Sequence, residues 1–349
     1  MSVFQRPHTT MMIVPTGVGA AIGGYAGDAL PVARAIATVT DRLITHPNVL
    51  NGAQLYWPIP NAYYVEGYAL DQFAAGRWRL QPVHQNTIGI VIDQAVEDDL
   101  RWRHLQAADA ARATLGLDIK GYVTTDVPLG VQLKQAQAAT WGTLERPDSL
   151  LRAVEHLRQT GCDAIAVIAR FPDDLSSEAL NDYRQGQGVD PLAGAEAVIS
   201  HLVVREFQIP CAHAPALQPL PLDTTISPRS AAEEIGYTFL PCVLAGLSKA
   251  PQFSAVLAPH SIGASEVDAL VVPASSLGGS AVLSLSSTAT QIIAVEDNST
   301  ALKVDAASLE LNVTIVRSYL EAIGAIATQR GGIALSALSP HIPHLQPLS

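Results

Sequence analysis

Short apolar runs alternate along this chain with longer segments of helical pattern. Runs such as Ile88 to Ile92 and Ala164 to Ala169 contain no polar side chain. Strands that are buried on both faces have this composition, and they belong to parallel sheets whose crossover helices cover both faces. The alternation therefore predicts an α/β fold with a mostly parallel sheet covered by helices.

The pattern gives bounds for the individual elements. Strands are expected at Met11 to Pro15, Ile88 to Ile92, Gly121 to Thr124, Ala164 to Ala169, Pro210 to Ala212, Ala255 to Leu257, Ala269 to Val272 and Gln291 to Val295. Helices are expected at Leu30 to Thr40, Asp98 to Leu115, Ser149 to Thr160, Leu192 to Phe207, Ala231 to Ser248 and Ala306 to Gln329. Ser230, with Glu233 three residues later, is typical of a capping box at the start of the helix over 231–248. Gly331 is expected to cap the C-terminus of the last helix.

A chain of 349 residues is long enough for one large unit or for two lobes. The break at Leu144-Glu-Arg-Pro147 suggests an N-terminal α/β lobe over 1–145, which holds a glycine-rich loop and an aromatic excursion. A C-terminal α/β lobe over 146–337 and a proline-rich tail over 338–349 would follow. The aromatic excursion over 51–86 is either a lid over a site, an oligomer contact or satellite packing on the core.

Charge and composition exclude several classes of partner. A net charge of −11 repels the phosphate backbone, so nucleic acid is not expected to bind. The uncharged stretch 269–295 contains Pro273 and many hydroxyl side chains, which fits buried strands rather than a membrane span. The start MSVFQRPHTT has no apolar signal segment, and three cysteines fit reduced thiols. We therefore expect a cytoplasmic protein, with a homo-oligomer left open.

The argument for a site rests on the residues that follow the predicted strands. Parallel α/β sheets bind ligands outside the carboxyl ends of their strands, so polar residues at those ends would share one crevice. The candidates for proton transfer are three histidines with three carboxylates to orient them. They are His46, His213, His260, Asp93, Asp126 and Glu296. The alternative for each carboxylate is that it caps the next helix or a turn.

Two glycine-rich loops and a polar turn supply candidate ligand-binding residues. They are Thr16, Gly17, Gly19, Gly23, Gly24, Asn48, Asn51, Ser276, Gly278, Gly279, Ser280 and Asn298. The first loop approximates a dinucleotide fingerprint, but its glycines continue to Gly27, and Asp28 is placed to cap the helix with a negative charge of its own. The second loop is either a nest for an anion or a tight turn. A dinucleotide is therefore disfavoured, and no cofactor is assigned.

Metal and nucleophile chemistry have weaker support. Cys211-Ala-His213 places a thiol and an imidazole on one face of a strand, but zinc sites pair their ligands at both ends of a motif, so no metal is assigned. No GxSxG elbow is present. Cys242 reads as a small buried apolar residue.

Four stretches of the chain carry a resemblance. They are Pro15 to Asp28, Asp41 to Asn51, Tyr64-Val-Glu-Gly67 and Glu234 to Pro251. In these stretches, and over essentially its whole length, the chain resembles an uncharacterised family of cyanobacteria and plants, classified as a domain of unknown function. The resemblance implies a cytosolic or plastid-type setting, and it brings no known reaction and no catalytic residues.

Two classes of function follow. The first is an enzyme that acts on a small polar or anionic metabolite in the crevice at the carboxyl ends of the strands. The second is a noncatalytic binding or assembly protein that uses the aromatic segment over 55–78 and the tail over 339–349 as contact surfaces. The sequence leaves open whether the protein is an enzyme at all.

Overall fold

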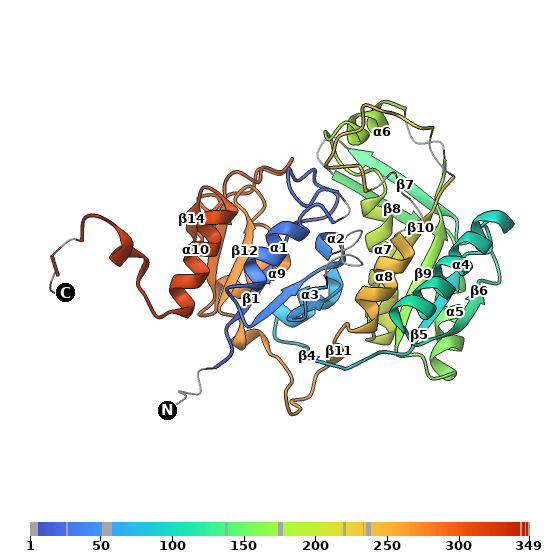
Figure 1. Cartoon of the computed structure of the whole chain (residues 1–349), viewed down its shortest axis with the longest axis horizontal. Helices are drawn as coiled ribbons and strands as arrows, with labels where there is room; N and C mark the ends of the chain where they lie inside the picture. Colours follow the sequence, from blue (N-terminus) through green and yellow to red (C-terminus); the bar gives the residue numbers. More distant parts are fainter. Residues whose placement is uncertain are drawn as a thin grey trace.

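Two parallel sheets organise the chain, one of six strands and one of four, in a computed structural model (Figure 1). The structure describes residues 6–25, 27–50, 58–136, 139–173, 177–218, 221–232, 234, 239–342, 344–345 and 347. Each sheet has helices on both faces, so the molecule has a six-stranded lobe and a four-stranded lobe side by side. The mixed α/β fold with largely parallel sheets is confirmed.

The six-stranded lobe combines the two ends of the chain. Its strands, in spatial order, are β14 (Thr314–Val316), β13 (Gln291–Val295), β12 (Ala269–Pro273), β1 (Thr9–Met12), β2 (Arg42–Thr45) and β3 (Ala62–Tyr64). All neighbours are parallel, so every strand ends at the same edge. The lobe's helices are α1 (Leu30–Ala37), α2 (Pro47–Leu50), α3 (Gly67–Ala74), α9 (Ser280–Ser286) and α10 (Tyr319–Arg330).

The four-stranded lobe is built from the middle of the chain. Its strands, in spatial order, are β10 (Cys211–Ala216), β9 (Ala164–Arg170), β5 (Ile88–Ile92) and β6 (Ile119–Thr124). They are again all parallel. The lobe's helices are α4 (Asp98–Leu115), α5 (Pro147–Gln159), α6 (Ser177–Arg184), α7 (Ala193–Phe207) and α8 (Phe239–Ser248). The hairpin β7 (Val131–Ala136) and β8 (Ala139–Leu144) packs on α7.

The core consists of two hydrophobic layers, one on each side of the sheets. Successive strand residues point to opposite faces, so Met12 and Ile90 belong to one layer while Met11 and Val91 belong to the other. Helices α1, α10, α4 and α8 cover the first layer. Helices α3, α9, α5 and α7 cover the second. Because both faces are covered, the strands are apolar at almost every position, which is the pattern seen in the sequence.

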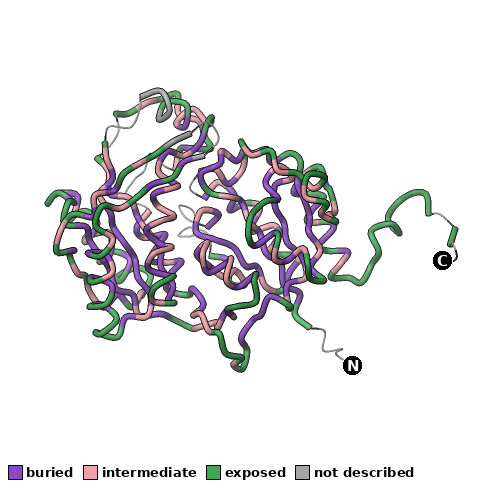
Figure 2. Tube along the Cα trace, turned by 180° about the vertical axis from the view of Figure 1, so that it is seen from behind, coloured by how far each residue is buried: buried purple, intermediate pink, exposed green. Residues whose placement is uncertain are grey.

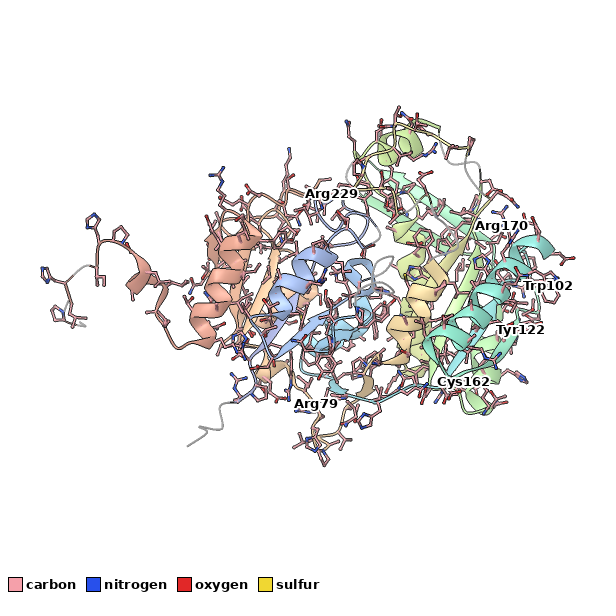
Figure 3. The ribbon with its side chains drawn as sticks, in the orientation of Figure 1. Arg79, Trp102, Tyr122, Cys162, Arg170 and Arg229 are labelled. Carbon is pink, nitrogen blue, oxygen red and sulfur yellow. The ribbon has the colours of Figure 1, made fainter. Side chains whose placement is uncertain are left out.

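A short ribbon joins the lobes. β4 (Arg79–Gln81) and β11 (Gln252–Ser254) pair antiparallel where the chain leaves the six-stranded lobe and where it returns. Arg79 lies at this ribbon, where it binds Ser261 and the carboxylate of Glu266, on η2 (Ala264–Glu266) (Figure 3). Each sheet therefore joins segments on both sides of residue 145, and the boundary expected there does not separate the two sheets.

Several element predictions were wrong. The run 255–257 is not a strand: the strand ends at Ser254, and Val256 and Leu257 are about three-quarters exposed, at 70% and 75%. The helix expected from residue 306 begins only at Tyr319, because the β-branched run before it forms β14 and Ser318 caps the helix. The helix expected over 231–248 is described from Phe239. Glu233 of the expected capping box lies outside the described residues.

The described part of the aromatic excursion is packed into the protein. Tyr64, Phe73 and Trp78 are buried, and the Trp78 ring stacks on Phe253 of β11 with 5.5 Å between ring centroids. Tyr56 and Trp57 lie outside the described residues. The described aromatics therefore form core packing beside the interlobe ribbon.

The tail extends away from both lobes, beyond η3 (Leu335–Leu338) (Figures 1 and 2). Its described residues are exposed. No helix among the described residues is both long and apolar enough to cross a bilayer, as the sequence indicated.

Candidate functional site

A cavity of about 590 Å³ lies between the lobes, and we call it the cleft. Residues that follow β1, β2, β3 and β12 form its wall on the six-stranded lobe, while residues that follow β9, together with β10 and α7, form the opposite wall. The carboxyl ends of strands from both sheets therefore open into one space. Its volume falls in the range of small-molecule sites, and most of its lining is apolar.

His213 forms a hydrogen-bonded group on the four-stranded side of the cleft. It lies within β10, and its Nδ1 is 2.6 Å from the hydroxyl of Ser200 on α7. Its Nε2 is 3.5 Å from a carboxylate oxygen of Glu196, one turn earlier on the same helix. All three line the cleft. This places an imidazole between a hydroxyl and a carboxylate, which is an arrangement that can accept and return a proton.

His201 joins the two lobes across the cleft. Its Nδ1 contacts the carboxylate of Glu66, which follows β3 in the six-stranded lobe. The second oxygen of Glu66 accepts hydrogen bonds from the backbone N–H groups of Tyr68 (2.8 Å) and Ala69 (3.2 Å), so Glu66 is also the N-cap of α3. Burial lowers the pKa of His201, but Glu66 and the charge of Asp71 outweigh burial and raise it.

We expect the contact between His201 and Glu66 to stabilise the protein less as the pH rises. A histidine whose pKa is raised by folding stabilises the protein below its unfolded value near 6.5, and this contribution is lost as pH rises through the raised pKa. The melting temperature of the protein should therefore fall relative to that of His201→Gln between pH 6 and pH 9. Thermal unfolding at several pH values measures this difference. His84→Gln, at an exposed site, is the matched control, and parallel curves for all three proteins would contradict the expectation.

His46, at the end of β2, is held differently. The backbone N–H of Val14 donates a hydrogen bond of 3.1 Å to its Nε2. Burial lowers its pKa to about 4, so the imidazole is neutral near pH 7. A proton-transfer role near neutral pH, as expected from the sequence, does not suit such a group.

Carboxylates outnumber cations in the cleft. Among the described lining residues, Arg184 is the one lysine or arginine, and it forms a bidentate pair with Glu234 at 2.9 and 3.0 Å. The lining carboxylates are Glu66, Asp71, Asp173, Asp190, Glu196 and Glu234. Asp71 accepts a backbone hydrogen bond from Ala281, and burial raises its pKa. The field inside the cleft is therefore negative.

Some candidates from the sequence line the cleft. They are Thr16, His46, Asn48, His213, Ser276, Gly279 and Ser280. The side-chain amide of Asn48 also donates to the carbonyl of Gly23 at 2.7 Å, so it supports the first glycine-rich loop. The expected convergence of β-strand ends is thus present, although it draws on two sheets rather than one.

Two candidate carboxylates, Asp93 and Asp126, support the local structure and do not line the cleft. Asp93 is buried and accepts hydrogen bonds from the backbone N–H groups of Ala95, Leu129 and Arg170. Asp126 is exposed and binds Ser149 and Arg152 at the start of α5. Asp93 therefore satisfies turn backbone groups, as the alternative held, whereas the partners of Asp126 are side chains of α5. Arg170 itself pairs with Glu97 and Asp173 at the carboxyl end of β9 (Figure 3).

His260 and Glu296 do not line the cleft either. His260 follows no strand, because the strand expected before it does not form; it lies in an exposed turn with φ of 63°. Glu296 follows β13 but is exposed. Neither residue is among those that line the cleft.

The first glycine-rich loop is a contact between the lobes. A Cβ atom on Gly19, where φ is +61°, would lie 2.7 Å from the carbonyl oxygen of Gly188 in the four-stranded lobe. Gly17 accepts a hydrogen bond from the backbone of Thr140 in the same lobe. The loop candidates Gly17, Gly19, Gly23 and Gly24 therefore serve close packing rather than lining the cleft.

Two polar side chains fix the shape of that loop. Asn298, fully buried, accepts from the N–H of Ile22 at 2.8 Å and donates to its carbonyl at 2.9 Å. The expected helix cap by Asp28 was wrong: its Oδ1 accepts from Gly23 and Tyr25, and its Oδ2 pairs with Arg229 of the four-stranded lobe (Figure 3). Gly278 is not among the lining residues, and Asn51 lies outside the described residues.

Sequence reasoning missed the residues that pair across or within the cleft. They are Glu66, Asp71, Arg184, Glu196, Ser200, His201 and Glu234. Glu196 and Ser200 are one helical turn apart, so they share a face of α7, and that spacing is visible in the sequence. In the described part of the chain no group of three histidine, cysteine or acidic side chains is arranged to hold a metal ion.

Comparisons with known proteins give a family but no activity. A family model described as "Protein of unknown function (DUF3326)" matches residues 9–339. The chain is also similar to an uncharacterized lipoprotein of Synechococcus sp., with 61% identity over 338 residues, which cover 96% of this chain and 94% of that protein. No solved structure matches the chain. The word lipoprotein in the relative's name differs from the cytoplasmic setting expected from the sequence.

Proposed function

The chain belongs to the DUF3326 family of proteins of unknown function, and from the geometry of its cleft we propose that it is an enzyme that moves protons on a small polar metabolite. Membership confirms the resemblance to an uncharacterised family. The observation that carries the proposal is that two histidines, each in contact with a carboxylate, line one cavity at the carboxyl ends of both sheets.

His213 is the proposed general base. The hydroxyl of Ser200 holds Nδ1 and Glu196 lies near Nε2, so the ring is oriented by two partners from the same helix. A carboxylate beside an imidazole stabilises the imidazolium that forms when the base takes a proton. Positioned acid–base groups typically contribute about 10²- to 10⁴-fold in rate.

His201 is the proposed general acid. Its raised pKa keeps the ring protonated to higher pH than an ordinary histidine, and Glu66 holds it at the lobe interface. An acid and a base on the same cleft allow a proton to be removed at one atom and delivered at another. His201 comes from α7 and His213 from the adjacent β10, so both belong to the four-stranded lobe.

The metabolite is proposed to be polar rather than anionic. The sequence left both forms open, but the lining carboxylates outnumber the one lining arginine, and that arginine is already paired with Glu234. An anionic ligand would enter a negative field with no free cation to receive it. A neutral or cationic ligand meets no such cost.

A thermal-shift screen tests the proposal. The panel contains nicotinamide and adenine nucleotides, coenzyme A, sugar phosphates, carboxylates, polyols and small amines. A ligand at a hundred times its Kd stabilises the folded state by about 2.7 kcal/mol, which raises Tm by several degrees. We expect a shift from compounds without net negative charge, and none from the anionic compounds.

The histidine variants then separate binding from chemistry. With a ligand from the screen as substrate, His213→Gln should lose about 10²- to 10⁴-fold in turnover while it retains most of the thermal shift. His84→Gln, at a residue that does not line the cleft, should match the unmodified protein. Full turnover by His213→Gln would refute its role as the base.

A noncatalytic assembly protein is the second candidate. It is favoured by the exposed tail, which extends away from both lobes and carries apolar side chains such as Leu338 and Ile342. If the tail joins copies of the chain, deletion of 338–349 will lower the mass measured in solution by light scattering. An unchanged mass and an unchanged set of co-purifying proteins would remove this candidate.

The cellular location also stays a proposal. We propose a cytoplasmic protein, because the three cysteines of the chain are free thiols and fit a reducing compartment. Cell fractionation is the test. Recovery in the membrane fraction would instead agree with the name of the Synechococcus relative.

A further inference from the structure

The tautomer of His46 is fixed by the backbone. Its Nε2 accepts the hydrogen bond from the N–H of Val14, so Nε2 must present a lone pair and cannot carry a hydrogen. A neutral imidazole has one N–H, and here it must therefore be on Nδ1. The donor Val14 lies two residues beyond the end of the neighbouring strand β1, so the placement of β1 beside β2 sets the orientation of the ring.

The Nδ1–H group is open to the cleft. The His46 residue is more than nine-tenths buried, yet it is one of the residues that line the cavity. Among the described residues Nδ1 has no hydrogen-bond partner, and it is not among the polar atoms that the protein encloses completely. The remaining surface of the ring therefore offers a donor to whatever occupies the cleft.

Hydroxyl and amide side chains, among them Thr16, Asn48 and Ser276, also line the cleft, but each can accept as well as donate, whereas the Nδ1–H of His46 only donates. Several lining residues are prolines, which have no backbone N–H. They are Pro15, Pro47, Pro172, Pro191 and Pro215. The carboxylates of the lining accept hydrogen bonds and donate none, and Arg184 is paired with Glu234. A ligand with an acceptor oxygen thus finds an uncharged donor at His46.

We propose that His46 is a substrate-binding hydrogen-bond donor that holds a carbonyl oxygen, and that the ligand of the cleft is a carbonyl compound without net negative charge. This inference rests on the proposed function and specifies its substrate class. A neutral imidazole can polarise a carbonyl oxygen without giving up its proton, because the uncharged ring is a weak acid. His46 then fixes the carbonyl while His213 and His201 act on neighbouring atoms.

The first experiment observes the tautomer directly. In protein labelled with ¹⁵N-histidine, the ring signals of His46 are assigned by their absence from His46→Gln, whose amide oxygen can still accept from Val14. We expect the Nδ1–H form alone between pH 5.5 and pH 8. An Nε2–H form, or a signal that titrates within this range, would overturn the proposal.

The second experiment uses paired probes that differ at one oxygen. The pairs are dihydroxyacetone with glycerol, and aminoacetone with 1-aminopropan-2-ol, each titrated to tens of millimolar. We expect the carbonyl member of at least one pair to move the His46 Nδ1 signal and to bind at least tenfold more tightly than its alcohol. His46→Gln should reduce that ratio by half or more. Equal affinities within both pairs, or an unmoved signal with every probe, would refute the proposal.

The failures of the two proposals are distinguishable. In His213→Gln the carbonyl probe should still move the His46 signal, because that variant leaves the donor in place. A carbonyl compound that binds at His46 but is never converted would remove the acid–base function and leave the donor role standing. Conversion of a substrate that has no carbonyl oxygen would remove the donor role and leave the acid–base function standing.

Discussion

Gly194→Ala should destabilise the protein by about 3 kcal/mol or more, because the added methyl group has no room. A Cβ atom there would lie 2.3 Å from the Cα of Trp141 and 2.4 Å from the carbonyl oxygen of Thr140, both in the backbone of β8. A strand backbone cannot turn aside as a flexible side chain can, so α7 must move away from the hairpin. Since α7 carries Glu196, Ser200 and His201, ligand binding in the cleft should weaken as well.

Urea unfolding followed by circular dichroism measures the change in the free energy of unfolding. Gly324→Ala is the matched control, because Gly324 also lies in a helix, α10, and a Cβ atom there meets nothing within 4 Å. Alanine is the better helix former, so this control should gain up to about 1 kcal/mol. Equal stabilities of the two variants would show that β8 and α7 do not pack as closely as described.

Acid should destabilise the protein through His46 by about 2 kcal/mol between pH 7 and pH 4.5. Folding lowers the pKa of this histidine from 6.5 to about 4, because the ring is buried. Below pH 6.5 the His46 ring takes up a proton in the unfolded chain, whereas in the folded protein it does so only when the pH falls to about 4. The free energy of unfolding is therefore highest above pH 6.5 and falls as the pH is lowered from 6.5 to about 4. Each unit of difference between the folded and unfolded pKa values is worth about 1.4 kcal/mol in the free energy of unfolding.

The measurement compares urea unfolding of the unmodified protein and of His46→Gln at each pH. Other groups also titrate in acid, and the comparison cancels their contribution because both proteins contain them. We expect the difference in free energy between the two proteins to change by about 2 kcal/mol across the window. A constant difference would mean that the ring is protonated in the folded state and that the Val14 contact is absent.

The sequence predicted most of the strands that are buried on both faces, although it missed the four-residue strand β2. Ile88–Ile92 and Gln291–Val295 have the observed bounds, because a strand covered by helices on both sides is apolar throughout. It missed β3, where Ala62 and Tyr63 are half-buried, and β11, which is short and lies in the interlobe ribbon. Such strands owe their formation to pairing with distant residues, and no local pattern records that pairing.

The residues of the candidate site could likewise be predicted in part, but their partners could not. His213 was expected just after a strand; it lies inside β10, which continues to Ala216, and it still reaches the cleft. The contact between Glu66 and His201 joins two lobes, so its residues are far apart in the sequence. Asp93 was chosen correctly as a polar residue after a strand, but of the backbone groups that it satisfies only that of Ala95 is local, and those of Leu129 and Arg170 come from two other segments. Residue type and strand position predict where polar atoms lie, whereas their partners depend on the arrangement of the lobes.

The order of strands in the six-stranded sheet has a consequence for synthesis on the ribosome. β1 pairs with β12, Thr10 opposite Ala269, so the central pairing of this sheet must wait until the chain has emerged as far as residue 273 of 349. At roughly 5 to 20 residues per second, the interval is on the order of 10 to 50 s. The four-stranded sheet has all its strands by residue 216 and can fold first. During that interval the edge of β1 is unpaired, which makes the nascent chain a client for chaperones that shield exposed strands.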